Sequence, residues 1–406
     1  MTPTVLLIGT LDTKGEEFSF LRERLRLAGV EVLVADVGTQ GEPGFAADIP
    51  REEVGAQAGV DVAALIAAGD RGAAIAAMAG AASALARRLY DEGAIQGVLS
   101  AGGSGNTAIA TAAMQTLPVG VPKLMVSTMA AGDTRDYVGG VDVTMMASVT
   151  DVAGLNSISS RILANAAAAM AGMLLAPVPE PAGDRPLVAA TMFGVTTPCV
   201  TRAREHLEGK GYEVLVFHAT GTGGRAMEAL VDGGFVDGVL DVTTTELCDD
   251  LVGGVLSAGP DRLRAAGRSG VPQVVSLGAL DMVNFGARDT VPPQFQQRNL
   301  YVHNPSVTLM RTTPEECAEL GRRIARKLAA ASGPVTLFVP LEGVSMIDAE
   351  GQPFHDPQAD EALFEALRDG LDGSSVELVE LPNNVNDEEF AIAMANKLDE
   401  YLGVRT

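Results

Sequence analysis

Short apolar runs alternate with longer segments in which apolar residues recur at helical spacing. In the first half, the apolar runs cover 5–10, 30–37, 97–102, 123–130 and 141–147. Helical patterns rich in alanine and leucine follow or separate these runs, at 16–28, 60–67, 73–92, 106–115 and 155–175. Near-continuous apolar strands that alternate with helices are typical of parallel sheets covered by helices on both faces. The pattern therefore predicts an α/β fold.

A proline-rich stretch interrupts the pattern near the middle of the chain. Residues 176–186 contain four prolines, a composition typical of a linker. After this stretch the apolar runs resume, at 187–193, 212–219, 238–242, 273–278, 335–340 and 376–381. We therefore predict a first domain over 1–176, a linker over 177–186 and a second domain over 187–406.

Three matches in the same order indicate that the second half repeats the first. Residues 29–36 match 211–218. The Gly-Val-Leu at Gly97 matches that at Gly238, and Val121-Pro matches Val271-Pro. The predicted fold is thus a pair of Rossmann-like, doubly wound parallel-sheet domains related by a diverged internal repeat. Such sheets bind ligands at the carboxyl ends of their strands.

Composition excludes several classes of protein. Hydrophobic residues make up 47% of the 406 residues, which is too many for a disordered chain. The net charge of −23, from 29 basic and 52 acidic residues, argues against binding to nucleic acids or anionic membranes. A phosphorylated ligand is not excluded, because backbone N–H groups can hold an anion locally.

Cysteine usage and the N-terminal sequence predict a cytoplasmic protein. The three cysteines are widely spaced, which indicates no disulfide framework and a reducing compartment. The chain begins at once with a strand-like run, so we expect no signal peptide. The longest apolar stretch, 162–177, is rich in alanine and shorter than about 20 residues, so it predicts a packed helix rather than a membrane span. Its small side chains also suit close packing across a subunit interface.

Two glycine-containing turns in the first half follow predicted strands and enter predicted helices, at 9–15 and 101–107. Glycines let the backbone approach a ligand and expose N–H groups at a helix N-terminus, which favours an anion. Ser104 and Thr107 add hydroxyl donors, and Lys14 supplies a charge for phosphate oxygens. Ordinary turn and helix-cap chemistry is the alternative explanation for each turn.

A third turn, 127–134, follows the next predicted strand. Its Asp133 is a candidate ligand for Mg²⁺ beside phosphates, or equally the N-cap of a short helix. Asp36 ends the second strand, where a ribose-binding acid often lies. The candidate nucleotide-binding residues of the three turns are Thr10, Asp12, Thr13, Lys14, Gly102, Gly103, Ser104, Gly105, Asn106, Thr107, Thr128 and Gly132.

Polar residues are densest at predicted strand ends in the second half. The glycine-rich segment 218–228 follows a strand and enters a helix, so it can form a nest for a carboxylate or phosphate. Arg225 adds a possible guanidinium fork. The candidate substrate-binding residues are Thr220, Gly221, Gly223, Gly224, Arg225, Asn284 and Asn304.

Four ionisable residues at these strand ends are candidates for catalysis: His218, Glu246, Asp281 and His303. A doubly wound sheet brings strand ends to one edge, and a histidine–carboxylate pair provides a general base near neutral pH. We therefore expect these residues to converge and to act as acids and bases. The alternative is that each histidine is a hydrogen-bonded structural residue.

The same motifs resemble the ATP-binding family of the tomato mosaic virus resistance protein. The resemblance covers about residues 1–400. It is carried by 9–14, 102–107, 127–134, 148–156, 218–224, 243–246, 278–286 and 303–305. It implies two Rossmann-like domains, ATP binding in the first domain and a homodimer. Relatives often have glycine where Asn106 stands, so this loop departs from the family's pattern.

These observations predict a cytoplasmic, two-domain protein that binds ATP, with Mg²⁺ at Asp133, in its first domain. The second domain is expected to act on a small anionic metabolite. The alternative is a non-catalytic, nucleotide-sensing module that regulates or binds a partner protein. No nucleic acid or membrane is expected as a partner.

Overall fold

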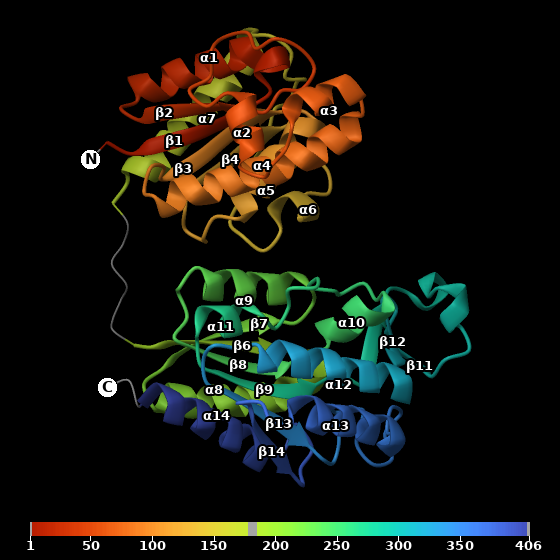
Figure 1. Cartoon of the computed structure of the whole chain (residues 1–406). Coiled ribbons are helices and arrows are strands. Elements are labelled where there is room, and N and C mark those ends of the chain that lie inside the picture. The colour runs from red at the N-terminus through yellow and green to blue at the C-terminus, as the bar shows by residue number, and fades with distance from the viewer. Residues whose placement is uncertain (1, 178–184, 404–406) are drawn as a thin grey trace. The chain divides into compact units, whose positions relative to one another are not determined.

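The computed structural model describes residues 2–177 and 185–403 (Figure 1). The chain divides into two compact units, Met1–Glu180 and Pro181–Thr406. Most of the linker predicted at 177–186 lies outside the described residues. Each unit has its own sheet and its own hydrophobic cores, as expected for separate domains.

The first unit is built on a five-stranded, all-parallel sheet with the order β2-β1-β3-β4-β5. Its strands are β1 (Thr4–Gly9), β2 (Glu31–Asp36), β3 (Gly97–Gly102), β4 (Lys123–Ser127) and β5 (Thr144–Ala147). Its helices are α1 (Leu11–Leu27), α2 (Arg51–Ala56), α3 (Val62–Ala68), α4 (Arg71–Asp91), α5 (Ser104–Gln115), α6 (Arg135–Val138) and α7 (Ser157–Leu175).

Helices cover both faces of this sheet, as its apolar strands require. On one face, Phe18 of α1 and Leu163 of α7 belong to one buried core with β1, β3 and β4. On the other face, α2, α4 and α5 form a second core around side chains such as Met78 and Ile109. Every residue of β3 is buried, which explains its apolar sequence and its central place.

The second unit has a six-stranded parallel sheet, β14-β13-β9-β8-β6-β7, and a separate antiparallel sheet, β10-β12-β11. Its strands are β6 (Leu187–Met192), β7 (Glu213–His218), β8 (Gly238–Thr243), β9 (Gln273–Gly278), β10 (Met282–Phe285), β11 (Leu300–Asn304), β12 (Val307–Arg311), β13 (Val335–Pro340) and β14 (Glu377–Leu381). The sequence pattern did not predict the antiparallel sheet, because its strands are short and lie within segments interpreted as loops.

Helices again cover both faces of the larger sheet. One core contains α8 and α14, and the opposite face carries α9 to α13. The α-helices are α8 (Thr197–Gly209), α9 (Thr222–Asp232), α10 (Glu246–Val252), α11 (Ala265–Ser269), α12 (Pro314–Ala329), α13 (Pro357–Leu371) and α14 (Glu388–Gly403). The 3-10 helices are η1 (Gly194–Thr196), η2 (Arg288–Thr290) and η3 (Pro293–Phe295).

The two sheets confirm the predicted fold class and support the internal repeat. The strand order β2-β1-β3-β4 of the first sheet recurs as β7-β6-β8-β9 in the second. The register is also shared: Gly97 pairs with Val5, and Gly238 pairs with Val188. The sequence match therefore aligns strands that occupy the same position and the same register in their sheets.

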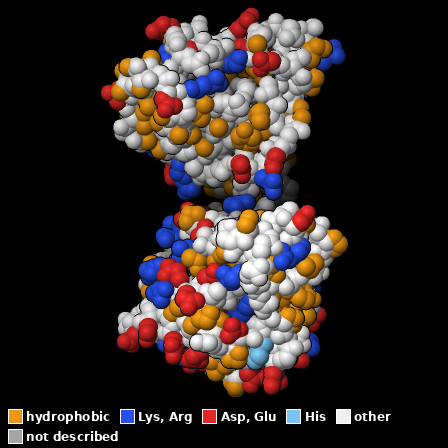
Figure 2. Space-filling model, turned by 90° about the vertical axis from the view of Figure 1, so that its right-hand side faces the viewer, with side chains coloured by type: hydrophobic (Ala, Val, Ile, Leu, Met, Phe, Trp, Pro, Cys, Tyr) orange, Lys and Arg blue, Asp and Glu red, His pale blue; other side chains and the backbone are white. Residues whose placement is uncertain are grey.

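The surface of each unit is mixed. On the face that Figure 2 shows, hydrophobic side chains are scattered among polar ones. Of the helices in the described part of the chain, only α7 is long and apolar enough to cross a membrane. Its Ala166, Ala167 and Met170 are buried against the sheet and α1, so this helix forms part of the core of its own unit.

Candidate functional site

The first unit has a cavity where its strand order reverses. The chain runs from β1 outward to β2 and then returns to β3 on the other side of β1, so the switch point lies between β1 and β3. A cavity of about 390 Å³ lies there. Nine of the predicted nucleotide-binding residues line it: Thr10, Asp12, Thr13, Lys14, Gly103, Ser104, Gly105, Asn106 and Thr128.

Two cationic side chains line this cavity. Lys14 lies at a kink in α1, and Arg71 begins α4. Neither forms an ion pair with any residue in the described part of the chain. Sequence reasoning missed Arg71, because it lies in a helical segment far from any strand end. Unpaired cations in a concave site favour an anionic ligand.

Backbone N–H groups also point to an anion here. The helices α1 and α5 begin at the cavity, after Thr10 and Gly103, and neither has a side-chain cap at its N-terminus. Five other helices, α3, α4, α7, α12 and α13, have such caps, whereas α2, α6, α8, α9, α10 and α11 also lack one. The first N–H of α1, that of Leu11, is already bound by Asp36 at 3.1 Å, so the start of α5 is the terminus better suited to a phosphate.

Two buried oxygen atoms beside the cavity lack a hydrogen-bond partner. Asn106 Nδ2 donates to Ser100 Oγ at 3.0 Å and to the Ala101 carbonyl at 2.8 Å, but Asn106 Oδ1 has no partner. Asp12 Oδ2 accepts the N–H of Gln40 at 2.7 Å, and Asp12 Oδ1 has no partner. Buried polar atoms are rarely left unpaired without a functional reason.

A strained residue lies close by. Val149, which follows β5, has φ = 62° and is 81% exposed. This left-handed conformation is a true outlier for a β-branched residue and persists only where the surroundings impose it. Val149 lies two residues before Asp151, which lines the cavity. The strained residue therefore lies on the segment that brings Asp151 to the cavity, although Val149 itself is not part of the lining.

The remaining candidates of the first unit lie outside the cavity lining. Gly102 ends β3, and Thr107 is buried, where its Oγ1 donates to the Gly103 carbonyl at 2.8 Å. Gly132 is exposed on the loop before α6. Asp133 is exposed and accepts hydrogen bonds from the guanidinium and from the backbone N–H of Arg135, which lower the pKa of its carboxyl group to about 2.

Asp36 has a structural role instead of the expected contact with a ribose. It is 2% exposed, and its Oδ1 accepts the N–H groups of Leu11 at 3.1 Å and Gly38 at 2.9 Å. Its Oδ2 lies 3.4 Å from Arg51 Nε. Asp36 therefore holds the turn after β1 against the turn after β2, which shapes one wall of the cavity.

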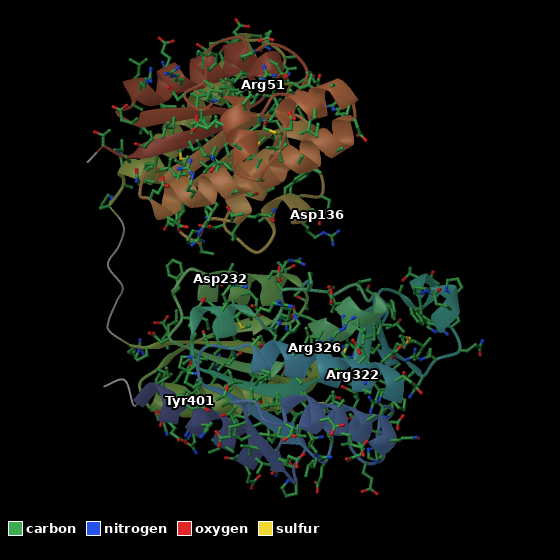
Figure 3. All side chains as sticks on the ribbon, viewed as in Figure 1. Arg51, Asp136, Asp232, Arg322, Arg326 and Tyr401 are labelled. Atoms are coloured by element: carbon green, nitrogen blue, oxygen red, sulfur yellow. The ribbon has the colours of Figure 1, made fainter. Side chains whose placement is uncertain are left out.

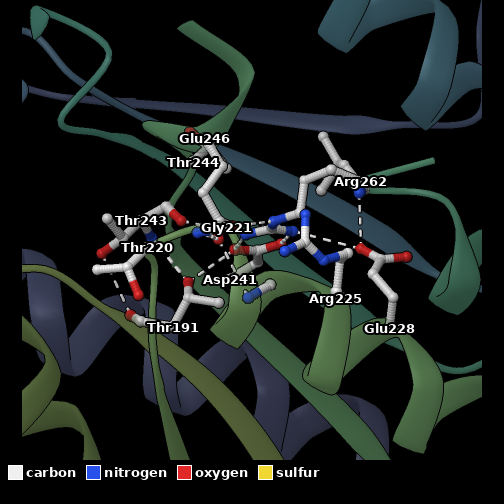
Figure 4. Close-up of polar contacts among 12 residues, drawn as sticks. Thr191, Thr220, Gly221, Arg225, Glu228, Asp241, Thr243, Thr244, Glu246 and Arg262 are labelled. Carbon is white, nitrogen blue, oxygen red and sulfur yellow. Dashed lines mark hydrogen bonds and ion pairs between the residues drawn. The ribbon is translucent and has the colours of Figure 1, made fainter. Parts of the chain in front are cut away.

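In the second unit, the protein's own Glu246 fills the predicted anion nest. Glu246 Oε1 accepts the N–H of Gly221 at 2.6 Å and that of Gly224 at 3.1 Å. Arg225, the expected guanidinium fork, also has a partner within the chain, because it donates to the Ser257 carbonyl at 3.0 Å. Figure 4 shows these contacts together with those of Arg262.

Arg262 lies at the centre of a fully buried ion network. Its guanidinium donates to Glu246 Oε2 at 2.6 Å and to both carboxylate oxygens of Asp241, at 2.5 and 2.7 Å. A longer contact of 3.4 Å joins it to Glu228. Thr191 Oγ1 donates to Asp241 as well, at 2.7 Å. The cation thus joins the ends of β6 and β8 to α9 and α10.

Asp281 belongs to a second buried network. It accepts a hydrogen bond from Ser345 Oγ at 2.8 Å, and its other oxygen has no partner. The nearby Arg311 donates to Asp348 at 3.3 Å and to Asp360 at 2.6 Å. Burial raises the pKa of Asp281 to about 6 and that of Asp348 to about 9. Three carboxyl groups share one guanidinium, so Asp348 keeps its proton at neutral pH.

The two histidines lie on exposed surfaces. His218 ends β7 and stacks on Phe193, with 5.4 Å between ring centroids. His303 lies in β11, with its ring 6.5 Å from that of Tyr301. Among the described residues, no hydrogen bond, ion pair or ring contact joins any two of His218, Glu246, Asp281 and His303. The proposal that they form one catalytic group stays a prediction.

The other predicted substrate-binding residues contact their own chain. Thr220 Oγ1 donates to the His218 carbonyl at 3.3 Å, and a side chain at Gly223 would collide with the same carbonyl. Asn284 is buried and donates to Asp249 at 2.7 Å. Asn304 accepts the N–H of Ser306 at 2.9 Å. No group of three or more His, Cys, Asp or Glu residues in the described ranges could hold a metal ion.

Comparison with known families agrees with this division of the chain. Residues 3–178 match the N-terminal domain of "Uncharacterised protein family (UPF0261)", and residues 185–402 match its C-terminal domain. The chain belongs to the UPF0261 family. UPF0261 proteins of Clostridium tetani and Rhizobium meliloti are 54% and 51% identical to it, over 98% and 96% of both chains respectively.

The resemblance to the tomato family is confirmed at this level. The tomato ToMV resistance protein Tm-1(GCR237) is 42% identical over 98% of this chain, which spans 56% of the tomato protein. Solved structures are far less similar. UDP-N-acetylglucosamine 2-epimerase from Rickettsia bellii is 10% identical, with a TM-score of 0.23 over 68% of this chain and 79% of its own. A likeness this low says nothing about ligand or activity.

The Arg262 network predicts a large loss of stability when its cation is removed. Arg262→Met would leave the buried carboxylates of Asp241 and Glu246 without a counter-charge. We expect the free energy of unfolding to fall by about 3–5 kcal/mol, the usual cost of breaking a buried ion pair. Urea unfolding followed by circular dichroism measures this change.

Arg202→Met is the matched control for this substitution. Arg202 lies on α8 of the same unit with 47% of its side chain exposed, and it pairs only with exposed glutamates. Its removal should change stability by no more than about 0.5 kcal/mol. Equal effects of the two substitutions would show that Arg262 does not have the stabilising role assigned to it.

The raised pKa of Asp348 predicts that the stability of the protein depends on pH. The pKa of Asp348 is 3.8 in the unfolded chain and about 9 in the folded protein. Between these two pH values Asp348 is protonated in the folded protein and ionised in the unfolded chain. Rising pH therefore favours the unfolded chain and lowers the free energy of unfolding. Relative to Asp348→Asn, which cannot titrate, the wild-type free energy of unfolding should fall by about 1 kcal/mol per pH unit from pH 6 to 8. Urea unfolding across this range tests it, and a difference independent of pH would contradict it.

Proposed function

We propose that the first unit binds ATP, or a similar nucleotide, in the cavity between β1 and β3. One observation carries this proposal. The cavity lies at the switch point of a doubly wound sheet, and two unpaired cations, Lys14 and Arg71, line it together with the uncapped start of α5. Nucleotides bind at this position in sheets of this type, with phosphates at helix N-termini.

The two sides of the cavity suit the two ends of a nucleotide. The turn at 103–106 and Lys14 offer backbone and ammonium donors for phosphate oxygens. Val37, Ile75 and Ile109 give the same cavity an apolar wall, which suits a base or ribose face. The volume of about 390 Å³ falls within the usual range for small-molecule sites.

A magnesium ion bound with the nucleotide would meet Asp12 rather than Asp133. Asp12 lines the cavity and has a buried oxygen without a partner, whereas Asp133 pairs with Arg135 away from the lining. Carboxylate oxygens are suitable ligands for Mg²⁺ beside phosphates. Asp12 would supply one such oxygen while its other oxygen holds the loop at Gln40.

A nucleotide-sensing role is the second candidate. Glu246 and Asp281 belong to buried networks. His218 and His303 are exposed, and among the described residues neither contacts these two acids. This arrangement favours nucleotide binding coupled to a partner over catalysis on a small anionic metabolite by these four residues. The homodimer and the cytoplasmic location also stay predictions.

Substitution of the two cations tests the nucleotide site. Lys14→Ala and Arg71→Ala should each weaken ATP binding by about 1–3 kcal/mol, because each removes a charged partner of the phosphates. Isothermal titration calorimetry on the full chain measures the affinities.

Arg87→Ala provides the control on the same helix as Arg71. Arg87 is exposed on α4, pairs with Asp91 and does not line the cavity. Its loss should leave ATP affinity unchanged. Undiminished ATP binding by both Lys14→Ala and Arg71→Ala would move the nucleotide out of this cavity.

A further inference from the structure

The second unit has a cavity of about 560 Å³ that lies away from its strand ends. It is bounded by α10, by the later part of the loop that follows α10, by α11 and by one side of α12. Its lining contains five cationic side chains, Arg264, Arg268, Arg323, Arg326 and Lys327, against two carboxylates, Asp250 and Glu319. In a chain with a net charge of −23, such a concentration of cations is unexpected.

Carboxylates of the chain only partly neutralise these cations. Glu319 is shared by three arginines, with distances of 2.9 Å to Arg322, 3.1 Å to Arg323 and 3.6 Å to Arg326. Figure 3 labels Arg322 and Arg326 on α12. Asp250 lies 3.5 Å from Arg323 and is the second carboxylate here. Two carboxylates thus face three guanidinium groups, and like charges this close repel one another. An external anion would relieve this repulsion.

Acids outside the lining do not remove the excess. Asp232, at the end of α9, pairs with Arg268 at 2.5 Å. Asp261 lies 4.0 Å from Arg264, and both side chains are mostly exposed, so this pair is weak. Even with these two acids included, the cations outnumber the carboxylates. Arg264 and Arg326 keep 55% and 65% of their side chains exposed, so their guanidinium groups can turn towards a ligand.

We propose that this cavity binds a small molecule that carries two or more phosphate groups. Several guanidinium forks from different elements match the bidentate geometry of phosphate oxygens. The lining contains no aromatic side chain on which a base could stack. The phosphate groups themselves would therefore provide most of the recognition.

Lys327 adds a second kind of donor at the base of the cavity. Its Nζ donates to the carbonyls of Pro260 and Arg262, both at 2.6 Å, which holds the ammonium group in place. Burial lowers the pKa of Lys327 to about 8, with Arg264 acting in the same direction and Glu228, Asp250 and Asp261 in the opposite one. A bound phosphate would favour the charged form, so binding should take up protons near pH 8.

The test uses pyrophosphate and the full chain with Lys14→Ala and Arg71→Ala already in place. These two changes remove the charged groups of the nucleotide cavity, so a remaining anion site is measured separately. Calorimetry should show one saturable pyrophosphate site per chain, with an affinity that falls as salt rises. A second series with ADP in place of pyrophosphate shows whether the site also accepts a nucleoside diphosphate.

Adding Arg264→Gln and Arg326→Gln should raise the dissociation constant for pyrophosphate by roughly tenfold or more, because two guanidinium partners are lost. Arg202→Gln, which removes one exposed charge elsewhere in the same unit, should not change it. Absence of saturable pyrophosphate binding, or binding that survives the Arg264→Gln and Arg326→Gln pair unchanged, would overturn the proposal. Neither result bears on ATP binding in the first unit.

Discussion

The second unit depends on one buried cation, the guanidinium of Arg262. Asp241, Glu246 and Glu228 come from a strand and two helices, and Arg262 is the counter-charge of the buried Asp241 and Glu246. Arg262 also donates to the Thr243 carbonyl at 3.1 Å, so it satisfies the backbone at the end of β8. Leu263, the next residue, adopts φ = 67°, a left-handed conformation that is unfavourable for leucine. This strained residue directly follows the buried Arg262.

The internal repeat relates the open cavity of the first unit to the turn that Glu246 fills in the second. The shared strand register aligns Ile8 with Thr191 and Ser100 with Asp241. Both pairs are joined by a hydrogen bond, from Ser100 Oγ to the Ile8 carbonyl and from Thr191 Oγ1 to Asp241. At the next equivalent site the second unit has Glu246 and the first unit has a glycine. A carboxylate thus fills in one unit the space that the other leaves open.

Sequence reasoning predicted the strands of the two parallel sheets, their parallel pairing and most residues that line the first cavity, because apolar periodicity and turn residues are local signals. It could not predict that the glycine-rich turn before α9 is already occupied. The carboxylate that fills it, Glu246, lies 22 residues beyond Gly224 in the sequence. It also missed Arg71 and Arg262, which act through tertiary contacts and lie in no recognisable motif. Spacing alone does not distinguish a turn open to a ligand from one closed by the chain itself.

Counted on from the aligned residues Gly97 and Gly238, Gly105 stands where the second unit has Glu246. A Cβ atom added at Gly105 would lie 3.1 Å from Ile75 Cδ1 and 3.7 Å from a terminal nitrogen of Arg71, so this position lies beside an apolar side chain and a cation. In the second unit, a carboxylate at the same position meets Arg262. In the first unit, Arg71 lies near Gly105 and has no carboxylate partner among the described residues. Under the proposed function, a phosphate of the nucleotide would supply the missing negative charge, which would let a chain of net charge −23 hold an anion in this cavity.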